Sequence, residues 1–307
     1  MRTSGETVAD LIRCGEREFA AAGIVCAHGT ANCRDEAAAI VYHVLNLDHA
    51  DPMAYQHPVS PQHRDRCESM FRRRIESRTP AAYLLGEAWF AGLAFHVDPR
   101  VLVPRSPFAE LIALRFEPWL RPAGRLRILE LGTGSGCIAI ACALAFPDST
   151  VLATDISAEA LEVARRNVRR HGVEDRVGLI EADLFAGVRG RFDLIVSNPP
   201  YVPDADLEDM PPEFACEPRS ALAGGRDGLD LVRRIVAGAG THLASDGLLV
   251  VEVGAGMHVL EASFPLIPFT WPEFEHGGDG IAIVAAGDLP RENDARGHGA
   301  RDGEAGR

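Results

Sequence analysis

Four short apolar runs in the second half of the chain constrain its fold most strongly. They are predicted to be buried strands, and each ends at a polar residue. The runs are residues 126–131, 150–153, 177–182 and 192–197, and their polar ends are Glu130, Asp155, Asp183 and Asn198. Helices are predicted over residues 137–145 and 157–171, the second with an apolar face and Ser157 as its N-cap. This alternation predicts an α/β fold with a doubly wound sheet, in which ligands bind beyond the carboxyl ends of the strands.

A glycine-rich turn leaves the first of these strands and opens the following helix. Its sequence is Glu130-Leu131-Gly132-Thr133-Gly134-Ser135-Gly136. Glycines let a backbone approach a ligand closely, and the start of a helix supplies free N–H groups. The dinucleotide spacing G-x-G-x-x-G is not met, because Cys137 stands at its sixth position. The turn predicts a ligand site of another kind, or else only close packing of a helix on a strand.

The fourth strand stops at Asn198-Pro199-Pro200-Tyr201. Two consecutive prolines cannot donate to a sheet ladder, and the first of them holds Asn198 extended at the end of the strand. The tetrapeptide therefore offers an amide, carbonyls without competing N–H groups, and one aromatic ring at a predicted ligand edge. A plain strand-ending turn is the alternative, which the glycine turn upstream disfavours.

Composition narrows the class of protein. The chain has 307 residues, a formal net charge of −13 and no lysine, whereas a DNA-binding protein normally shows a basic footprint. Its seven cysteines include no C-x-x-C pair, so neither a zinc site nor a disulfide framework is indicated, and reduced thiols in the cytoplasm are expected. No apolar run is long enough to span a membrane, and no signal peptide is recognised.

Together these strands and turns resemble the class I S-adenosylmethionine-dependent methyltransferases over residues 126–286. The resemblance implies that the glycine turn wraps the methionine part of S-adenosylmethionine, that Asp155 binds its ribose, and that Asp183 and Leu184 lie near its adenine. The expected sheet has seven strands, with further strands at residues 248–253, 269–275 and 281–286 and an antiparallel last strand. The complete set of expected cofactor-binding residues is Glu130, Gly132, Thr133, Gly134, Ser135, Gly136, Asp155, Ile156, Asp183, Leu184 and Asn198.

The motif ending at Tyr201 narrows this resemblance to methyltransferases that act on planar nitrogens. With a predicted hairpin over residues 87–105 and the segment 214–222, the chain resembles the protein glutamine N5-methyltransferases. The release-factor branch usually continues Pro-Arg with Pro-Asp-Thr-Glu, but here residues 104–110 read Pro-Arg-Ser-Pro-Phe-Ala-Glu. This sequence, together with segments 28–32, 269–274 and 277–280, resembles the branch that methylates ribosomal protein L-three of the large subunit. Ala94 departs from this branch, which commonly has proline there.

For this chemistry we predict that the Asn198 side-chain oxygen and the Pro199 carbonyl accept both hydrogens of a substrate amide. Tyr201 would pack its ring on the amide plane. Pro200 and Glu217 are further candidates for substrate binding. No general base and no metal ion is required by the scheme.

The chain is predicted to comprise a helical substrate-recognition domain (1–86), a hairpin linker (87–105), a methyltransferase domain (106–286) and a polar, disordered tail (287–307). In the first domain, helices are expected over residues 35–47 and 67–78, with Pro61 before the second as a boundary. The run Arg72-Arg73-Arg74 is interpreted as a solvated face, and His28 as a structural residue at a helix cap. Arg105 could brace the interdomain hinge or line the pocket.

The expected partner is ribosomal protein L-three, free or on a precursor particle, with no direct DNA binding. Three alternatives stay open. They are a release-factor glutamine methyltransferase, an adenine-specific DNA methyltransferase, and a non-catalytic assembly factor that grips a ribosomal protein.

Overall fold

The computed structural model describes residues 6–121, 124–275 and 278–290, which form two compact units. The first unit comprises residues up to Phe90, Ala94–Arg105 and Met210–Pro218, and the second the remainder. The boundaries therefore differ from a simple succession of domains, since residues 210–218 join the first unit although both flanking segments belong to the second. Within the described ranges, no helix is long and apolar enough to cross a membrane.

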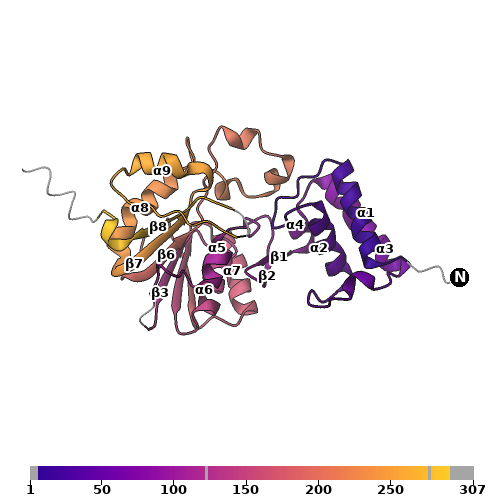
Figure 1. Ribbon diagram of the computed structural model, residues 1–307, viewed down its shortest axis with the longest axis horizontal. Coiled ribbons are helices and arrows are strands. Elements are labelled where there is room, and N and C mark those ends of the chain that lie inside the picture. The colour runs from indigo at the N-terminus through magenta and orange to yellow at the C-terminus, as the bar shows by residue number, and fades with distance from the viewer. Residues whose placement is uncertain (1–5, 122–123, 276–277, 291–307) are drawn as a thin grey trace, which may run out of the picture. The chain divides into compact units, whose positions relative to one another are not determined.

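The first unit is built on three packed helices, α1 (Val8–Ala21), α2 (Cys33–Leu45) and α3 (Pro61–Ser77) (Figure 1). Phe19 of α1 meets Phe71 of α3 edge to face, with ring centroids 5.4 Å apart. Helix α3 begins six residues before the predicted start, with Ser60 as its N-cap and Pro61 as its first residue. The earlier start has a physical reason, because the first helical position needs no N–H donor and therefore suits proline.

The rest of the first unit consists of short helices, strands and turns. Helix α4 (Ala81–Leu85) leads into a two-stranded sheet of β1 (Glu87–Phe90) and β2 (Leu93–His96), which is the predicted hairpin. The segment 101–105 beyond it forms no strand. Two 3-10 turns, η1 (Ala54–Gln56) and η3 (Pro212–Cys216), complete the unit.

One buried arginine corrects the interpretation of the arginine run. Arg72 and Arg73 are exposed, but Arg74 is fully buried and its Nε donates to Glu36 of α2 at 2.7 Å. Position 74 follows Cys67 and Phe71 at helical spacing, so it lies on the apolar face of α3. A carboxylate 38 residues away in sequence makes its burial possible.

The second unit is a six-stranded sheet in the order β5-β4-β3-β6-β7-β8. All neighbours are parallel except β7 and β8. The strands are β3 (Arg127–Leu131), β4 (Thr150–Asp155), β5 (Val177–Glu181), β6 (Phe192–Ser197), β7 (Leu243–Glu252) and β8 (Ile281–Ala285). The doubly wound sheet with an antiparallel last strand is confirmed.

The prediction of a seventh strand over residues 269–275 was wrong. Of the described residues in that segment, only Thr270 pairs with the sheet, through one antiparallel bridge to Ile283. Pro268 and Pro272 flank it, and neither has an N–H to extend a ladder. The predicted turn at residues 277–280 lies partly outside the described residues.

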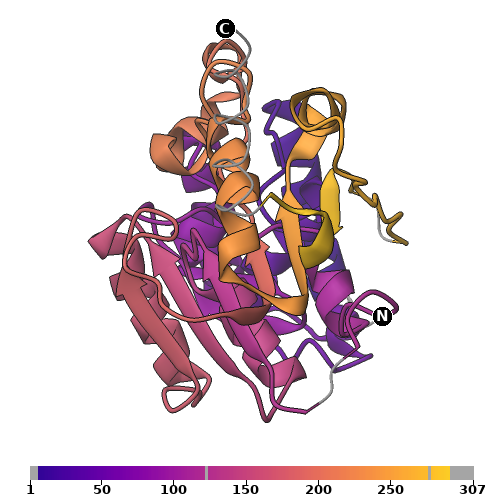
Figure 2. The same cartoon turned by 90° about the vertical axis from the view of Figure 1, so that its left-hand side faces the viewer.

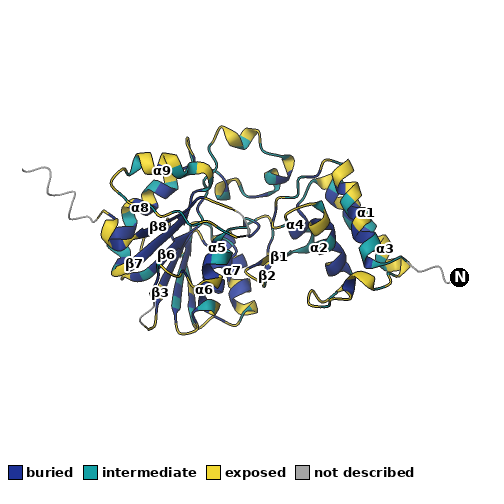
Figure 3. Ribbon diagram, in the orientation of Figure 1, coloured by how far each residue is buried: buried dark blue, intermediate teal, exposed yellow. Residues whose placement is uncertain are grey.

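Helices cover both faces of the sheet (Figures 1 and 2). Helices α6 (Cys137–Ala145) and α7 (Ala158–Arg170) contact β3, β4 and β5, and α5 (Phe108–Ala113) packs on α6. Helices α8 (Asp230–His242) and α9 (Met257–Ser263) contribute Val232, Ile235 and Leu260 to a core shared with the opposite face. The central strands β3 and β6 are therefore buried from both sides (Figure 3), as near-continuous apolar runs require.

The end of the second unit corrects the predicted tail. Residues 286–288 form the 3-10 turn η6 (Ala286–Asp288), and Leu289 is buried in the core that contains α8. The folded chain therefore continues to residue 290, and the remainder of the predicted tail lies outside the described residues.

Candidate active site

The strand order reverses between β3 and β6, and this switch point brings two predicted motifs together. Leu131 pairs in register with Ser197, and the Ser197 hydroxyl donates to the Leu131 carbonyl at 2.8 Å. The next residues along the two strands are Gly132 and Asn198. The glycine turn and the Asn-Pro-Pro-Tyr motif therefore leave the same edge of the sheet side by side, at the place where open α/β sheets bind ligands.

The glycine turn requires its glycines. Gly132, Gly134 and Gly136 have φ of 72°, 53° and 81°, in the left-handed region that disfavours other side chains. A Cβ at Gly132 or Gly134 would meet nothing within 4 Å, whereas one at Gly136 would lie 3.3 Å from the Ala164 Cβ. The first two glycines thus present bare backbone to an open space, and the third allows α6 to pack on α7.

Buried polar side chains hold this turn from beneath. Glu130 accepts hydrogen bonds from the Thr133 hydroxyl at 2.5 Å and from the Ala139 N–H at 3.0 Å. The Asn167 side chain of α7 donates to the Ser135 carbonyl at 2.8 Å. Glu130, Thr133 and Ser135 are at most 3% exposed, so they shape the turn and the start of α6.

Burial raises the pKa of Glu130 to about 8, although the hydrogen bonds from Thr133 and Ala139 act against the rise. Between the usual value of 4.5 and about 8, the folded chain holds a proton that the unfolded chain has released. Stability from this group is therefore fully present below pH 4.5 and is lost as the pH rises through 8.

Glu130→Gln is expected to remove this pH dependence. The unfolding free energy of the wild type relative to the variant should fall as the pH rises, by at most about 1.4 kcal/mol per pH unit. Urea denaturation at several pH values measures it. Glu181→Gln, on an exposed carboxyl at the end of β5, is the matched control. A wild-type-to-variant difference that stays constant with pH would contradict the buried neutral form.

Asp155 ends β4 beside the glycine turn. One carboxylate oxygen accepts from the Gly134 N–H at 2.8 Å and the other from the Ser157 N–H at 2.9 Å. Burial raises the pKa of this carboxyl, while the three backbone N–H groups around it act to lower the pKa. Ile156 follows with its side chain 67% exposed. The structure thus brings Asp155 and Ile156 to the same edge as the turn.

Asp183 and Leu184, which follow β5, lie in different environments. Leu184 adopts a φ of 52°, and its carbonyl accepts from the Thr154 hydroxyl at 3.3 Å, which ties it to the end of β4. Asp183 is exposed and pairs with Arg234 of α8 at 2.8 Å. Leu184 is therefore anchored to the site edge, whereas the carboxylate of Asp183 faces solvent and α8.

The Asn-Pro-Pro-Tyr motif combines one free polar side chain with one fixed ring. Asn198 is half-buried, and no described residue is hydrogen bonded to its side chain. Pro199 is buried. The Tyr201 hydroxyl donates to Glu252 at 2.8 Å, and a Cβ at Gly254 would come within 2.8 Å of the Tyr201 ring. The amide is available to a ligand, while the ring is held in one orientation.

Sequence reasoning missed Glu252 and Ser106. Glu252 is 4% exposed at the carboxyl end of β7, where it accepts from Tyr201 and from the Ser106 hydroxyl. The sequence did contain a signal for Glu252. It is a carboxylate that follows the apolar run 248–251, in the same way that Glu130 and Asp155 stand at the ends of predicted strands. Glu252 orients the predicted catalytic ring from the strand next to β6.

Glu217 belongs to the first unit, in the segment 210–218 of the loop that follows the motif. Its carboxylate accepts two hydrogen bonds from Arg105, both at 2.7 Å, and one from the Val103 N–H at 3.0 Å. Burial acts to raise the pKa of Glu217, but Arg105 and the nearby His28 outweigh it and lower the pKa to about 2. The structure gives Glu217 and Arg105 a structural role in the first unit, and a contact of Glu217 with substrate stays a prediction.

The same segment is fastened by a second glutamate. Glu213 accepts from Arg78 and from the Val25 N–H, both at 3.2 Å. His28 is buried against Phe214, with ring centroids 4.5 Å apart, and lies in the loop before α2 rather than at a helix cap. The part of the chain that the structure describes holds no cluster of three or more His, Cys, Asp or Glu able to bind a metal ion.

Comparison with known proteins yields relatives that match nearly the whole chain. It is 46% identical over 283 residues to a ribosomal protein uL3 glutamine methyltransferase of Bordetella pertussis, covering 91% of this chain and 95% of that protein. A protein of the same name from Xanthomonas campestris is 46% identical over 286 residues, covering 92% of both chains.

Two family models and one solved structure also match the chain. The model described as methyltransferase small domain matches residues 119–225, and that described as PrmC N-terminal domain matches residues 10–86. The crystal structure of the hMettl16 catalytic domain, in complex with MAT2A 3'UTR hairpin 6, aligns with a TM-score of 0.50. It is 16% identical and covers 74% of this chain and 81% of that one, which supports the fold alone.

Proposed function

The chain belongs to the family of ribosomal protein uL3 glutamine methyltransferases, and from this premise we propose the reaction that it catalyses. It transfers a methyl group from S-adenosylmethionine to the side-chain amide nitrogen, N5, of a glutamine in ribosomal protein uL3, the L-three protein of the large subunit. The observation that carries this proposal is the Asn198 side chain, which lies at the switch point of the sheet and has no hydrogen-bond partner among the described residues.

The residues at this edge fit S-adenosylmethionine. The bare backbone of Gly132 and Gly134 leaves space for the methionine part, and the half-buried Asp155 offers carboxylate oxygens to the ribose hydroxyls. Leu184, anchored through Thr154, offers an apolar contact to the adenine. When bound, the sulfonium supplies an electrophilic methyl group.

Asn198 and Pro199 make the substrate nitrogen reactive. An amide nitrogen is a poor nucleophile because its lone pair is delocalised into the carbonyl. The Asn198 side-chain oxygen and the Pro199 carbonyl accept its two hydrogens, which raises the electron density on the nitrogen and fixes its direction. Such alignment supplies a large part of the acceleration available to a transfer reaction.

Tyr201 restricts the plane of the substrate. Its ring is held by the hydrogen bond to Glu252 and by the close approach of Gly254, so it provides a rigid surface on which a planar amide stacks. Ser106 holds the second oxygen of Glu252 and so completes the support. These residues position the ring and take no part in proton transfer.

The same two acceptors discriminate against glutamate. A glutamate carboxylate has no N–H groups to donate, so the Asn198 oxygen and the Pro199 carbonyl would lie unpaired in the closed site. Leaving buried polar groups unpaired costs about 1–3 kcal/mol each. No general base is needed, because the methylated amide releases its extra proton to water.

The partner is a basic ribosomal protein that approaches an acidic chain, whose formal net charge is −13. Such complementarity raises the rate of encounter. We assign recognition of the substrate mainly to the first unit, place the reaction in the cytoplasm on free uL3 or on a precursor ribosomal particle, and expect no direct DNA binding.

The first test offers labelled S-adenosylmethionine and three purified acceptors: uL3, a release factor and DNA. We expect label on uL3 alone, at one glutamine that gains a single methyl group, mapped by mass spectrometry. Label on the release factor would keep the chemistry but overturn the substrate, and label on DNA would overturn the substrate class. Absence of label from all three would favour a non-catalytic assembly factor.

A further inference from the structure

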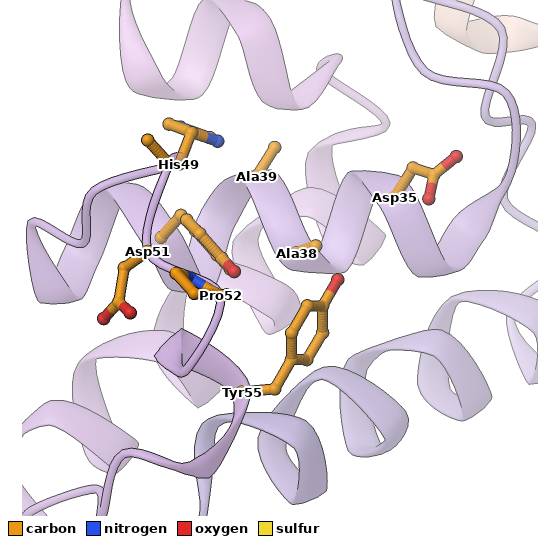
Figure 4. A pocket seen from close by; sticks show the side chains of 9 residues that line it. Asp35, Ala38, Ala39, His49, Asp51, Pro52 and Tyr55 are labelled. Carbon is orange, nitrogen blue, oxygen red and sulfur yellow. The ribbon is translucent and has the colours of Figure 1, made fainter.

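A pocket of about 400 Å³ opens on the first unit, between α2 and the loop that follows it (Figure 4). Tyr55 of η1 extends towards Ala38 on α2, and Asp51 lies on the loop between α2 and η1 (Figure 4). The pocket takes no part in the site described above, since all of its lining residues belong to the first unit. Its polar and aromatic lining residues include Asp35, Tyr42, His49, Asp51 and Tyr55.

Aromatic rings form a connected row along the pocket. Tyr42 stacks with His49 at a centroid distance of 4.8 Å, and Tyr55 meets Tyr42 edge to face at 6.2 Å. Trp89 extends the row beyond His49, with ring centroids 4.9 Å apart. Tyr55 and Trp89 remain 42% and 48% exposed, so aromatic surface is offered to a ligand rather than used up in the core.

Tyr42 lines this pocket and brings a hydroxyl group to it. Tyr42 is only 7% exposed, yet no described residue is hydrogen bonded to its hydroxyl. Burial raises the pKa of Tyr42, and the nearby Tyr55 and Asp51 add to the rise. The hydroxyl oxygen keeps contact with solvent in the pocket, so a polar group of a ligand can replace the water there.

The charge of the pocket is negative. Asp35 and Asp51 line it, and the sequence contains no lysine or arginine from residue 35 to residue 63. Asp51 accepts from the Met53 N–H at 2.8 Å through one oxygen, and its other oxygen lies 3.1 Å from His57. These contacts hold the carboxylate in place beside the aromatic row. Carboxylates together with exposed aromatic faces are the surroundings that stabilise a cationic side chain.

We propose that this pocket binds an arginine or lysine side chain of the protein substrate, with the cation on the aromatic row and its N–H groups directed to Asp51 and Tyr42. The identity of the partner rests on the proposed function, whereas the preference for a cation rests on the pocket alone. The pocket thereby recognises the substrate through a side chain distinct from the methylated glutamine.

Direct binding tests the pocket without any enzymatic activity. The probes are the N-acetyl methylamides of arginine and lysine, with the citrulline derivative as a neutral isostere of arginine, titrated into the full-length protein and followed by NMR. At least one cationic probe should shift the Tyr42, His49 or Tyr55 signals, and its affinity should exceed that of citrulline by about fivefold or more. Equal binding of the cationic and neutral probes, or no binding, would overturn the proposal.

Variants connect the pocket to the substrate. Asp51→Asn keeps the oxygen that accepts from Met53, and Tyr42→Phe keeps the buried ring, so both should retain the wild-type Tm. Asp65→Asn, an exposed residue of α3 outside the pocket, makes the same charge change elsewhere. We expect both pocket variants to raise the Kd for uL3 about tenfold and to leave the rate at saturating uL3 within twofold, while Asp65→Asn changes neither.

The outcomes separate the two proposals. If wild-type protein transfers no methyl to uL3 but binds a cationic probe, the proposed function fails and the cation pocket stands. If transfer to uL3 occurs and both pocket variants bind uL3 as the wild type does, the role of the pocket in recognition is refuted and the proposed function stands.

Discussion

Asn198→Ala is expected to abolish methyl transfer while leaving the affinity for S-adenosylhomocysteine within a few-fold of the wild type. The substitution removes one of the two acceptors of the substrate amide, and loss of one aligned hydrogen-bonding group at a reacting centre costs about 10²–10³-fold in rate. The fold should be unaffected, because no described residue is hydrogen bonded to the Asn198 side chain. Single-turnover transfer to uL3 measures the rate, and calorimetry measures the affinity.

The control for this experiment is Asp204→Asn, on an exposed residue of the loop that leaves the same motif. It should retain wild-type transfer and affinity. An Asn198→Ala variant that loses activity and affinity in equal proportion would show that Asn198 mainly holds the cofactor, and the assigned role in orienting the substrate would be wrong.

Arg74→Ala is expected to destabilise the first unit by about 3–5 kcal/mol, because it leaves Glu36 buried without its charge partner. Arg74 is fully buried, and it also donates to the Val25 carbonyl at 3.2 Å. Hydrogen exchange of the α2 and α3 amides reports on this unit separately, which matters because a chain with two units need not unfold in one transition.

Arg73→Ala is the matched control, one residue earlier on the exposed face of the same helix. Its effect should stay within about 0.5 kcal/mol. Combining Glu36→Ala with Arg74→Ala should cost less than the sum of the single substitutions, since the pair is then removed together. An Arg74→Ala variant as stable as Arg73→Ala would mean that water reaches the buried carboxylate.

Local patterns predicted most of the second unit. Helix α6 has the predicted bounds, and α7 begins directly after its predicted N-cap, Ser157, whose hydroxyl accepts from the Ala160 N–H. Short apolar runs, caps and glycines act within a few residues of one another, so their consequences can be worked out from neighbouring positions. The predicted strand over residues 269–275 does not form, because the prolines on either side of Thr270, at positions 268 and 272, have no N–H to extend its pairing.

Sequence patterns nominated candidate residues at this edge of the sheet, but not the residues that support them. Glu130, Asp155 and Asn198 were found because each follows a buried strand. Glu252 was not predicted as a site residue, because its role depends on the hydroxyls of Tyr201 and Ser106, which are 51 and 146 residues away in the sequence. Sequence reasoning named Glu217 as a candidate for substrate binding, but local patterns could not predict that Arg105, 112 residues away, binds its carboxylate.

By itself the sequence determined the fold class, the family and the edge of the sheet at which the cofactor and substrate amide are expected. These follow from strand patterns, glycine positions and the Asn-Pro-Pro-Tyr motif, all of which are local. Only the tertiary structure decided that β3 lies beside β6, that Arg74 is buried, that residues 210–218 join the first unit, and that a pocket lined by Tyr42 opens beside α2. The physical reason is that burial and ion pairing depend on partners supplied by distant segments, and no single stretch of sequence specifies its partner.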